Sequence, residues 1–177
     1  WRYLAEPDRG INGRQMVTPR GKALGGSSTI NGQMYMRGHP LDYDNWAKMG
    51  ASGWSFADVL PYFKKAESFA GGSDAYRGDS GPLITTPAPL ANPLYKVFLD
   101  AAKQAGYART TDINGYQQDG FCRFDMNIDH GVRASSAHAL LHPAMRRDNL
   151  QVETLCHARS IMFEQKRAMG VEYRQHG

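Results

Sequence analysis

The chain has 177 residues, of which 41% are hydrophobic and 21% charged, and its net charge is +4. It contains no run of about 18 apolar residues of the kind that forms a membrane-spanning helix, and no secretory signal is recognised, so we expect a cytoplasmic or peripherally membrane-associated protein. The basic residues are scattered among acidic and apolar positions, which argues against a dedicated nucleic-acid surface. Two cysteines, Cys122 and Cys156, are too few for a disulfide framework.

The first predicted helix follows a long irregular segment. Residues 5–26 are rich in turn-forming residues and are predicted to be coil. The stretch "HPLDYDNWAKMG" then predicts a helix, because Pro40 stands at a first helical position and Gly50 lies just past the end.

A second helix is predicted to begin after Ser55, because Ser55 and Asp58 form a capping box. Pro61 is expected to kink or shorten this helix, since proline removes a backbone donor. The apolar face would consist of Phe56, Val59, Leu60 and Phe63.

A loop over residues 71–82 and a short strand around Leu83–Thr86 precede the clearest helical pattern of the chain. In "NPLYKVFLDAAKQAG", Asn92 is the expected N-cap and Gly106 the expected end. One face of this helix is apolar and is predicted to be buried: Leu94, Val97, Phe98, Ala101, Ala102 and Ala105.

Strict alternation over residues 121–129 predicts a half-buried strand that ends in a "DHG" turn. Its inward positions would be Cys122, Phe124, Met126 and Ile128, and its outward positions Arg123, Asp125, Asn127 and Asp129.

The last part of the chain is predicted to contain a short helix and three strands. The helix would follow Ser135 or Ser136 and stop near Pro143. A strand is predicted at Leu150–Thr154, and a hairpin turn across "EQKR" would join Ala158–Phe163 to Ala168–Tyr173. The whole pattern predicts an α+β or mixed α/β fold without regular βαβ alternation.

The stretch "PRGKALGGSSTINGQMYMRG", residues 19–38, is the most informative motif. It is not a phosphate-binding P-loop, because Gly21-Lys22 is followed by Ala23 and the position five residues earlier is Met16. The G-x-G-x-x-G dinucleotide fingerprint does not occur in the chain either. Composition alone leaves a glycine-rich surface turn as the simplest interpretation.

The spacing of this stretch resembles the first signature of the glucose-methanol-choline (GMC) oxidoreductase family. The matching core is Gly-Lys-x-Leu-Gly-Gly-Ser-Ser-x-Ile-Asn, with Tyr35, Gly38 and Asp44 at fixed offsets. The resemblance continues through "NGYQQDGF", "GVRASSA" and "NLQVETLCHARSI", and covers essentially the whole chain. It implies a partial GMC fold with three parts: a flavin-contacting segment with lid helices (1–70), part of the substrate-binding domain (71–132), and part of the FAD-binding domain with a terminal hairpin (133–177).

The resemblance also implies FAD as the cofactor. Gly25 and Gly26 would let the main chain approach the flavin without an intervening Cβ, and Ser27 would face the diphosphate or ribityl oxygens. The full set of cofactor residues implied is Gly25, Gly26, Ser27, Asn31, Gly32, Met34 and Ala158, the last through backbone atoms only. Ile30 occupies the position at which some family members link the flavin to a histidine, so we expect FAD to be bound non-covalently.

In this family the ADP-binding glycine fingerprint precedes the segment present here, and the catalytic histidine lies far downstream. We therefore expect an internal portion of a larger flavoenzyme that oxidises a small-molecule alcohol, with choline favoured, and that has no catalytic residue within residues 1–177. The isolated portion should be inactive, and its exposed surfaces would need the missing strands or self-association. The alternatives are a relative that acts on aliphatic or aryl alcohols, a non-catalytic module that binds a nucleotide or a partner, and an unrelated glycine-rich phosphate or nucleic-acid binder.

Other motifs support these alternatives poorly. His138 and His142 have a spacing compatible with a metal, but no third ligand is evident and no metal site is expected. The paired serines lack the G-x-S-x-G elbow of a hydrolase. Tyr35, Trp46 and Trp54 are expected to pack in the core or a lid rather than to form a cage for a quaternary ammonium group.

Overall fold

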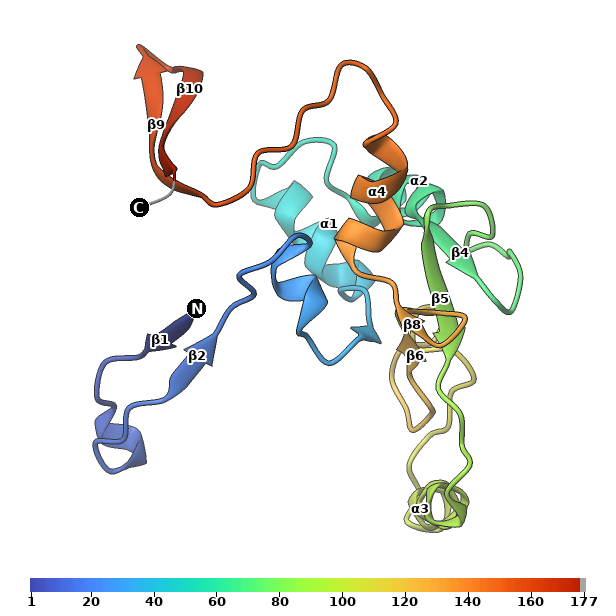
Figure 1. The fold of residues 1–177 in the computed structure, drawn as a ribbon. Coiled ribbons are helices and arrows are strands. Elements are labelled where there is room, and N and C mark those ends of the chain that lie inside the picture. The colour runs from blue at the N-terminus through green and yellow to red at the C-terminus, as the bar shows by residue number, and fades with distance from the viewer. Residues whose placement is uncertain (176–177) are drawn as a thin grey trace. The chain divides into compact units, whose positions relative to one another are not determined.

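A computed structural model describes residues 1–175 of the chain. The chain divides into two compact units, Trp1–Pro143 and Ala144–Gly177, each of which is described by itself. The elements in chain order are β1 Arg2–Leu4, η1 Arg9–Ile11, β2 Val17–Pro19, η2 Gly26–Thr29, β3 Met34–Tyr35, α1 Pro40–Lys48, α2 Phe56–Ala66, β4 Glu67–Phe69, β5 Leu83–Pro87, α3 Pro93–Gln104, β6 Asp125–Met126, β7 Ile128–Asp129, β8 Val132–Arg133, η3 Ala137–Leu141, α4 His142–Ala144, β9 Cys156–Glu164 and β10 Arg167–Gln175 (Figure 1).

The start of the chain is more ordered than the prediction of coil over residues 5–26. β1 and β2 pair antiparallel, with Tyr3 opposite Thr18. The intervening turn η1 is capped by Asp8, whose side chain accepts a hydrogen bond from the Gly10 amide at 2.7 Å. The coil prediction was therefore wrong at residues 17–19, because a three-residue strand is stabilised by its partner and carries little signal of its own.

Helices α1 and α2 confirm the two predicted capping patterns. Pro40 opens α1, and Gly50, with φ of 105°, follows its end. Ser55 and Asp58 form the predicted capping box of α2. Pro61 does not shorten α2, which continues to Ala66.

The two helices are joined by hydrogen bonding and by aromatic packing. The Asp44 side chain accepts a hydrogen bond from the Phe56 amide at the start of α2. The Tyr43 ring lies 5.4 Å from Trp46 and 5.7 Å from Phe63, both in edge-on contact. No helix in the described part of the chain is long and apolar enough to cross a bilayer.

The larger unit contains a mixed four-stranded sheet in the order β3-β6-β5-β4. β4 and β5 run parallel, and the other pairs are antiparallel. The predicted strand at Leu83–Thr86 is confirmed as β5. Met126 lies opposite Met34 on one side and Thr86 on the other, so β6 connects the glycine-rich stretch to the sheet.

Helix α3 has the predicted ends, but the prediction for its buried face is confirmed only at Ala102. Asn92 caps it, accepting a hydrogen bond from the Leu94 amide at 2.9 Å, and Gly106 follows its end. The helix residues that are buried are Leu99 and Ala102, whereas Val97 and Phe98 remain 61% and 62% exposed. Within the described residues, the broad apolar face is therefore left largely open.

The predicted strand over residues 121–129 is broken into β6 and β7. Asp125 was predicted to face outward, yet it is only 6% exposed, and Phe124 was predicted to face inward, yet it is 37% exposed. The prediction was wrong because it assumed that apolar side chains decide the buried face, whereas here a salt bridge from Arg77 to Asp125 decides it. The turn between β7 and β8 is confirmed at His130–Gly131, both with positive φ.

The second unit contains the predicted terminal hairpin. β9 and β10 pair antiparallel, with Ile161 opposite Val171, and the turn lies at Gln165–Lys166 (Figure 1). The predicted strand at Leu150–Thr154 is absent from the described structure, since the strand begins only at Cys156. The last two residues of the predicted 133–177 part lie outside the described residues.

The core contains fewer large apolar side chains than a globular domain of this length usually buries. In the described residues, the buried apolar positions are Ala88, Leu99, Ala102, Ala134, Ala137 and Ala139. The largest side chains that are fully buried are those of Arg77, Glu67 and Thr85. Charged and polar groups thus occupy the most buried positions among the described residues.

Candidate functional site

The segment Gly25–Met34, called the glycine segment below, contains six of the seven residues predicted to contact a cofactor. Its glycines fall into two kinds. A Cβ on Gly25 would lie 2.6 Å from Thr29 Oγ1 and 3.1 Å from Ala137 Cβ, and the φ of Gly25 is +87°. Gly25 is therefore required by the fold of the chain itself.

Gly26 and Gly32 belong to the second kind, because no heavy atom lies within 4 Å of a Cβ built on either residue. Gly26 has a φ of +56°, whereas Gly32 has no such conformational need for glycine. The space beside these two main-chain positions is open, and internal packing of the described residues does not explain the lack of a side chain at Gly32.

Two serines fix the first turn of the glycine segment. Ser28 Oγ donates to the Gly25 carbonyl at 2.5 Å, and Ser136 Oγ donates to the same carbonyl at 3.1 Å. The Ser136 amide donates back to Ser28 Oγ at 2.9 Å. The two contacts of Ser136 join residues more than 100 positions apart and hold the start of η2 in place.

Arg133, on β8, holds the next part of the glycine segment. Its Nη1 donates to the Asn31 carbonyl at 2.8 Å and to Asn31 Oδ1 at 2.9 Å. The Gln33 amide also donates to Asn31 Oδ1, at 3.1 Å. The Asn31 side chain is thus fixed through its oxygen.

The end of the glycine segment is held by the sheet. The Asn127 amide donates to the Gln33 carbonyl at 2.8 Å, and Met34 pairs with Met126. Asn127 Nδ2 is buried without a hydrogen-bond partner among the described residues. Buried amide groups are usually paired, so a polar partner from outside the described residues would satisfy it.

The predicted cofactor residues of the first unit are accessible as well as adjacent. Ser27, Asn31, Gly32 and Met34 are all exposed. The Ser27 hydroxyl accepts a hydrogen bond from the Gly21 amide at 3.2 Å and keeps its own proton for another acceptor. Ala158 lies on β9 in the other unit, opposite Tyr173, and is also exposed.

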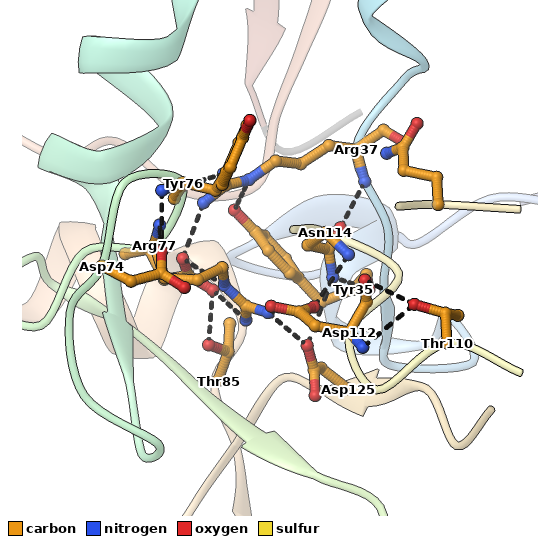
Figure 2. Close-up of polar contacts among 12 residues, drawn as sticks. Tyr35, Arg37, Asp74, Tyr76, Arg77, Thr85, Thr110, Asp112, Asn114 and Asp125 are labelled. Carbon is orange, nitrogen blue, oxygen red and sulfur yellow. Dashed lines mark hydrogen bonds and ion pairs between the residues drawn. The ribbon is translucent and has the colours of Figure 1, made fainter. Parts of the chain in front are cut away.

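A second polar site, called the charge cluster below, contacts the chain at and after β3. It consists of Arg37, Glu67, Arg77, Asp112 and Asp125 (Figure 2). Glu67 is fully buried; its Oε2 accepts from Arg37 at 2.6 Å, and its Oε1 accepts from Arg77 at 2.7 Å. Sequence reasoning missed this cluster, because single charges far apart in the sequence give the same signal as surface residues.

Arg77 is the centre of the charge cluster. It also donates a hydrogen bond to Asp112 at 2.7 Å and forms an ion pair with Asp125 at 2.9 Å, and its guanidinium lies 3.6 Å from the centre of the Phe69 ring. Burial alone would lower the pKa of the Arg77 guanidinium, but its hydrogen bonds to Glu67 and Asp112 raise that pKa above its ordinary value. Arg77 therefore stays charged.

Neutral groups complete the cluster and connect it to β3. The Asn114 side chain accepts from the Arg37 amide at 2.9 Å and donates to Asp125 at 3.2 Å. The Tyr35 hydroxyl accepts from Arg37 Nε at 3.2 Å, and burial raises the pKa of Tyr35 above its ordinary value of 10.0 (Figure 2). These contacts fix the chain directly after the glycine segment.

A shallow cavity of about 430 Å³ lies beside the charge cluster, and its lining includes Asp112, Tyr76 and Tyr116. None of the predicted cofactor residues lines it. The Tyr76 and Tyr116 rings lie 6.3 Å apart, and the carboxylate of Asp112 is already engaged by Arg77.

The remaining candidate residues have ordinary partners. His138 contacts Asp129 at 3.2 Å, and hydrogen bonds from His130 and His138 lower the pKa of Asp129. The described residues contain no group of three potential metal ligands. Trp46 and Trp54 pack edge-on at 5.9 Å.

The two cysteines are both free thiols. Burial, with Asp125 and Asp112 nearby, raises the pKa of the Cys122 thiol, which disfavours a reactive thiolate.

The fold matches solved structures of an oxidase and of an FAD-dependent oxidoreductase over nearly the full length of this chain. Pyridoxine 4-oxidase from Mesorbium loti has a TM-score of 0.91 at 31% identity, covering 99% of this chain and 35% of that chain. An FAD-dependent oxidoreductase from Chaetomium thermophilum has a TM-score of 0.89 at 28% identity, covering 98% of this chain and 32% of that chain. The fold of the chain is thus that of about a third of each of these two oxidoreductases.

The family model described as GMC oxidoreductase matches residues 9–177, and the chain belongs to this family. Oxygen-dependent choline dehydrogenase of Photobacterium profundum is 48% identical over 174 residues, which are 97% of this chain and 31% of that protein. The corresponding protein of Sinorhizobium fredii is 48% identical over 177 residues, which are 100% of this chain and 32% of that protein. The chain thus spans about a third of the length of these relatives.

Proposed function

We propose that this chain is part of an FAD-dependent alcohol dehydrogenase that oxidises choline to betaine aldehyde. The observation that carries the proposal is the open main chain at Gly26 and Gly32, within a segment that hydrogen bonds from Arg133 and Ser136 hold in place. The choice of choline is supported by 48% identity, over the whole chain, to proteins named for choline. The parts 1–70, 71–132 and 133–177 keep their proposed roles in flavin contact, substrate binding and FAD binding.

The residues present fit a flat cofactor. A ring can lie against main chain that carries no Cβ, and the exposed Ser27 hydroxyl and Asn31 amide offer donors to its polar atoms. Gly25, Gly26 and Ser27 would hold the ribityl and diphosphate part, and Asn31, Gly32 and Met34 the ring. Ala158 would contribute its backbone to the adenine.

When bound, FAD supplies an acceptor for the hydride that leaves the alcohol carbon. The residues of this chain would position that acceptor, because Arg133 and Ser136 hold the glycine segment in place. The hydroxyl proton of the alcohol needs a base. We propose that this base lies outside residues 1–177, so the chain alone is inactive.

The test uses the full-length enzyme, meaning the longer polypeptide that we propose contains this chain. We expect a yellow protein whose flavin absorption is lost when choline is added without oxygen. In Gly32→Val, bound FAD should fall while the thermal stability of the apoprotein stays unchanged, because the fold leaves space at this position. A colourless protein that oxidises choline regardless of added FAD would refute the proposal, and turnover of aryl alcohols but not of choline would refute the substrate.

We further propose that FAD is bound non-covalently, because Ile30 has no nucleophilic side chain with which to form a link. Acid precipitation of the full-length enzyme should release all of its FAD into solution. Flavin that remains on the precipitated polypeptide would refute this part of the proposal.

A further inference from the structure

Arg133 contacts the glycine segment through a single nitrogen. Its three hydrogen bonds within the described residues all use Nη1, at 2.8 Å to the Asn31 carbonyl, 2.9 Å to Asn31 Oδ1 and 3.5 Å to the Ser28 carbonyl. Arg133 is half-buried on β8, opposite Ile128 on β7. The short strand pair therefore places one cationic donor beside Asn31.

This contact determines the orientation of the Asn31 amide. Arg133 and the Gln33 amide can only donate, and both lie within 3.1 Å of the same side-chain atom. That atom must be the carboxamide oxygen, because a nitrogen there would place donor against donor. The Asn31 NH₂ group then forms no hydrogen bond within the described residues, and the side chain is exposed.

We propose that Arg133 is a positioning residue for Asn31. It holds the carboxamide so that the NH₂ group is presented to the flavin, and its charge polarises the amide and strengthens that donor. A donor aimed at the ring favours the form of the flavin that carries more negative charge, so it raises the reduction potential. This inference rests on the proposed function, because it takes Asn31 to lie beside the cofactor.

The first experiment compares two variants of the full-length holoenzyme. Arg133→Met keeps much of the length of the side chain but removes the hydrogen-bond donor. We expect this variant to have a lower FAD reduction potential and a changed flavin absorption spectrum. Its kcat should fall on the order of 10–100-fold, with KM little changed. Arg133→Lys should retain most of the potential and of kcat, because one ammonium nitrogen can replace Nη1. Arg123→Met is the matched control, since Arg123 is exposed, and should leave the spectrum and the potential unchanged.

The second experiment asks whether Arg133 acts through Asn31. In an Asn31→Ala background, Arg133→Met should no longer lower the potential, because the amide that it positions is gone. Equal shifts with and without Asn31, an equal shift in Arg123→Met, or an unchanged potential and spectrum in Arg133→Met would each overturn the inference. If Arg133→Met does not fold, the FAD reduction potential of Arg133→Lys tests the inference instead. A potential near the wild-type value supports the inference, and a large fall overturns it. Wild-type enzyme without bound flavin would instead overturn the proposed function.

Discussion

The charge cluster and the glycine segment adjoin at β3 but are built on opposite principles. In the cluster, five ionised side chains are packed against each other, and Glu67 and Arg77 are fully buried. In the glycine segment, the main chain is open at Gly26 and Gly32 and is fixed by hydrogen bonds from Ser136 and Arg133. The charges of the cluster are paired with each other, whereas the glycine segment leaves hydrogen-bond donors and space for another group.

The difference shows how the chain can hold an open surface rigidly. Tyr35 lies on β3 at the end of the glycine segment, and its hydroxyl accepts a hydrogen bond from Arg37 of the cluster. The buried ion pairs thus hold one end of the segment, and Arg133 and Ser136 hold its middle and start. A segment that is fixed at its start, middle and end can keep its main chain exposed, because these contacts prevent it from closing the open space.

The largest expected effect comes from breaking the charge cluster. Arg77→Met would leave the carboxylates of Asp112 and Asp125 without their cation, and removing one partner of a buried ion pair costs about 3–5 kcal/mol. Urea unfolding of the full-length enzyme should show this loss. Lys96→Met, which removes an exposed partner of Asp100, is the control and should have little effect on stability. Equal stability of Arg77→Met and the wild type would refute a structural role for the cluster.

Gly25→Val tests the part of the glycine segment that is packed. A left-handed backbone costs a branched residue about 1–2 kcal/mol, and overlap with Thr29 and Ala137 adds to this cost. We expect the apoprotein to melt at a lower temperature and FAD to be lost. A variant with normal melting of the apoprotein and full FAD occupancy would contradict the packing described here.

Gly26→Ala and Gly13→Ala form a matched pair that isolates the open part of the segment. Both glycines have positive φ, +56° and +72°, and no atom lies within 4 Å of either added Cβ. Each substitution should therefore cost a similar amount of stability, about 1 kcal/mol. Titration of the apoproteins with FAD should show weaker binding in Gly26→Ala alone. Equal FAD affinities of the two variants would show that the cofactor does not lie against Gly26.

The smallest effect is expected at the junction of the two regions. Tyr35→Phe removes the acceptor of Arg37 Nε, at a cost of about 1 kcal/mol near neutral pH. The folded pKa of Tyr35 is raised, so the stability linked to its proton is present below pH 10.0 and is lost as the pH rises from there through the folded pKa. The stability difference between the wild type and Tyr35→Phe should therefore narrow in alkaline solution. A difference that stays constant across that range would show that Tyr35 does not titrate as described.

Features that depend on neighbouring residues were predicted correctly from the sequence. The caps at Ser55 and Asn92 are formed by groups two or three positions apart, so the sequence contains both partners of each hydrogen bond. The same reasoning predicted the turn at His130–Gly131 and the terminal hairpin. The spacing of the glycine-rich stretch also indicated the family, which the family model confirms over residues 9–177.

Features that depend on distant partners were decided only by the tertiary structure. Asp125 is buried because Arg77 reaches it, and Leu99 rather than Phe98 is buried on α3 because burial depends on what packs against the helix. Arg133 reaches Asn31 across 102 positions. The physical reason is that an ion pair or a side-chain hydrogen bond stabilises only at contact distance, and the folding of the whole unit decides which distant groups come into contact.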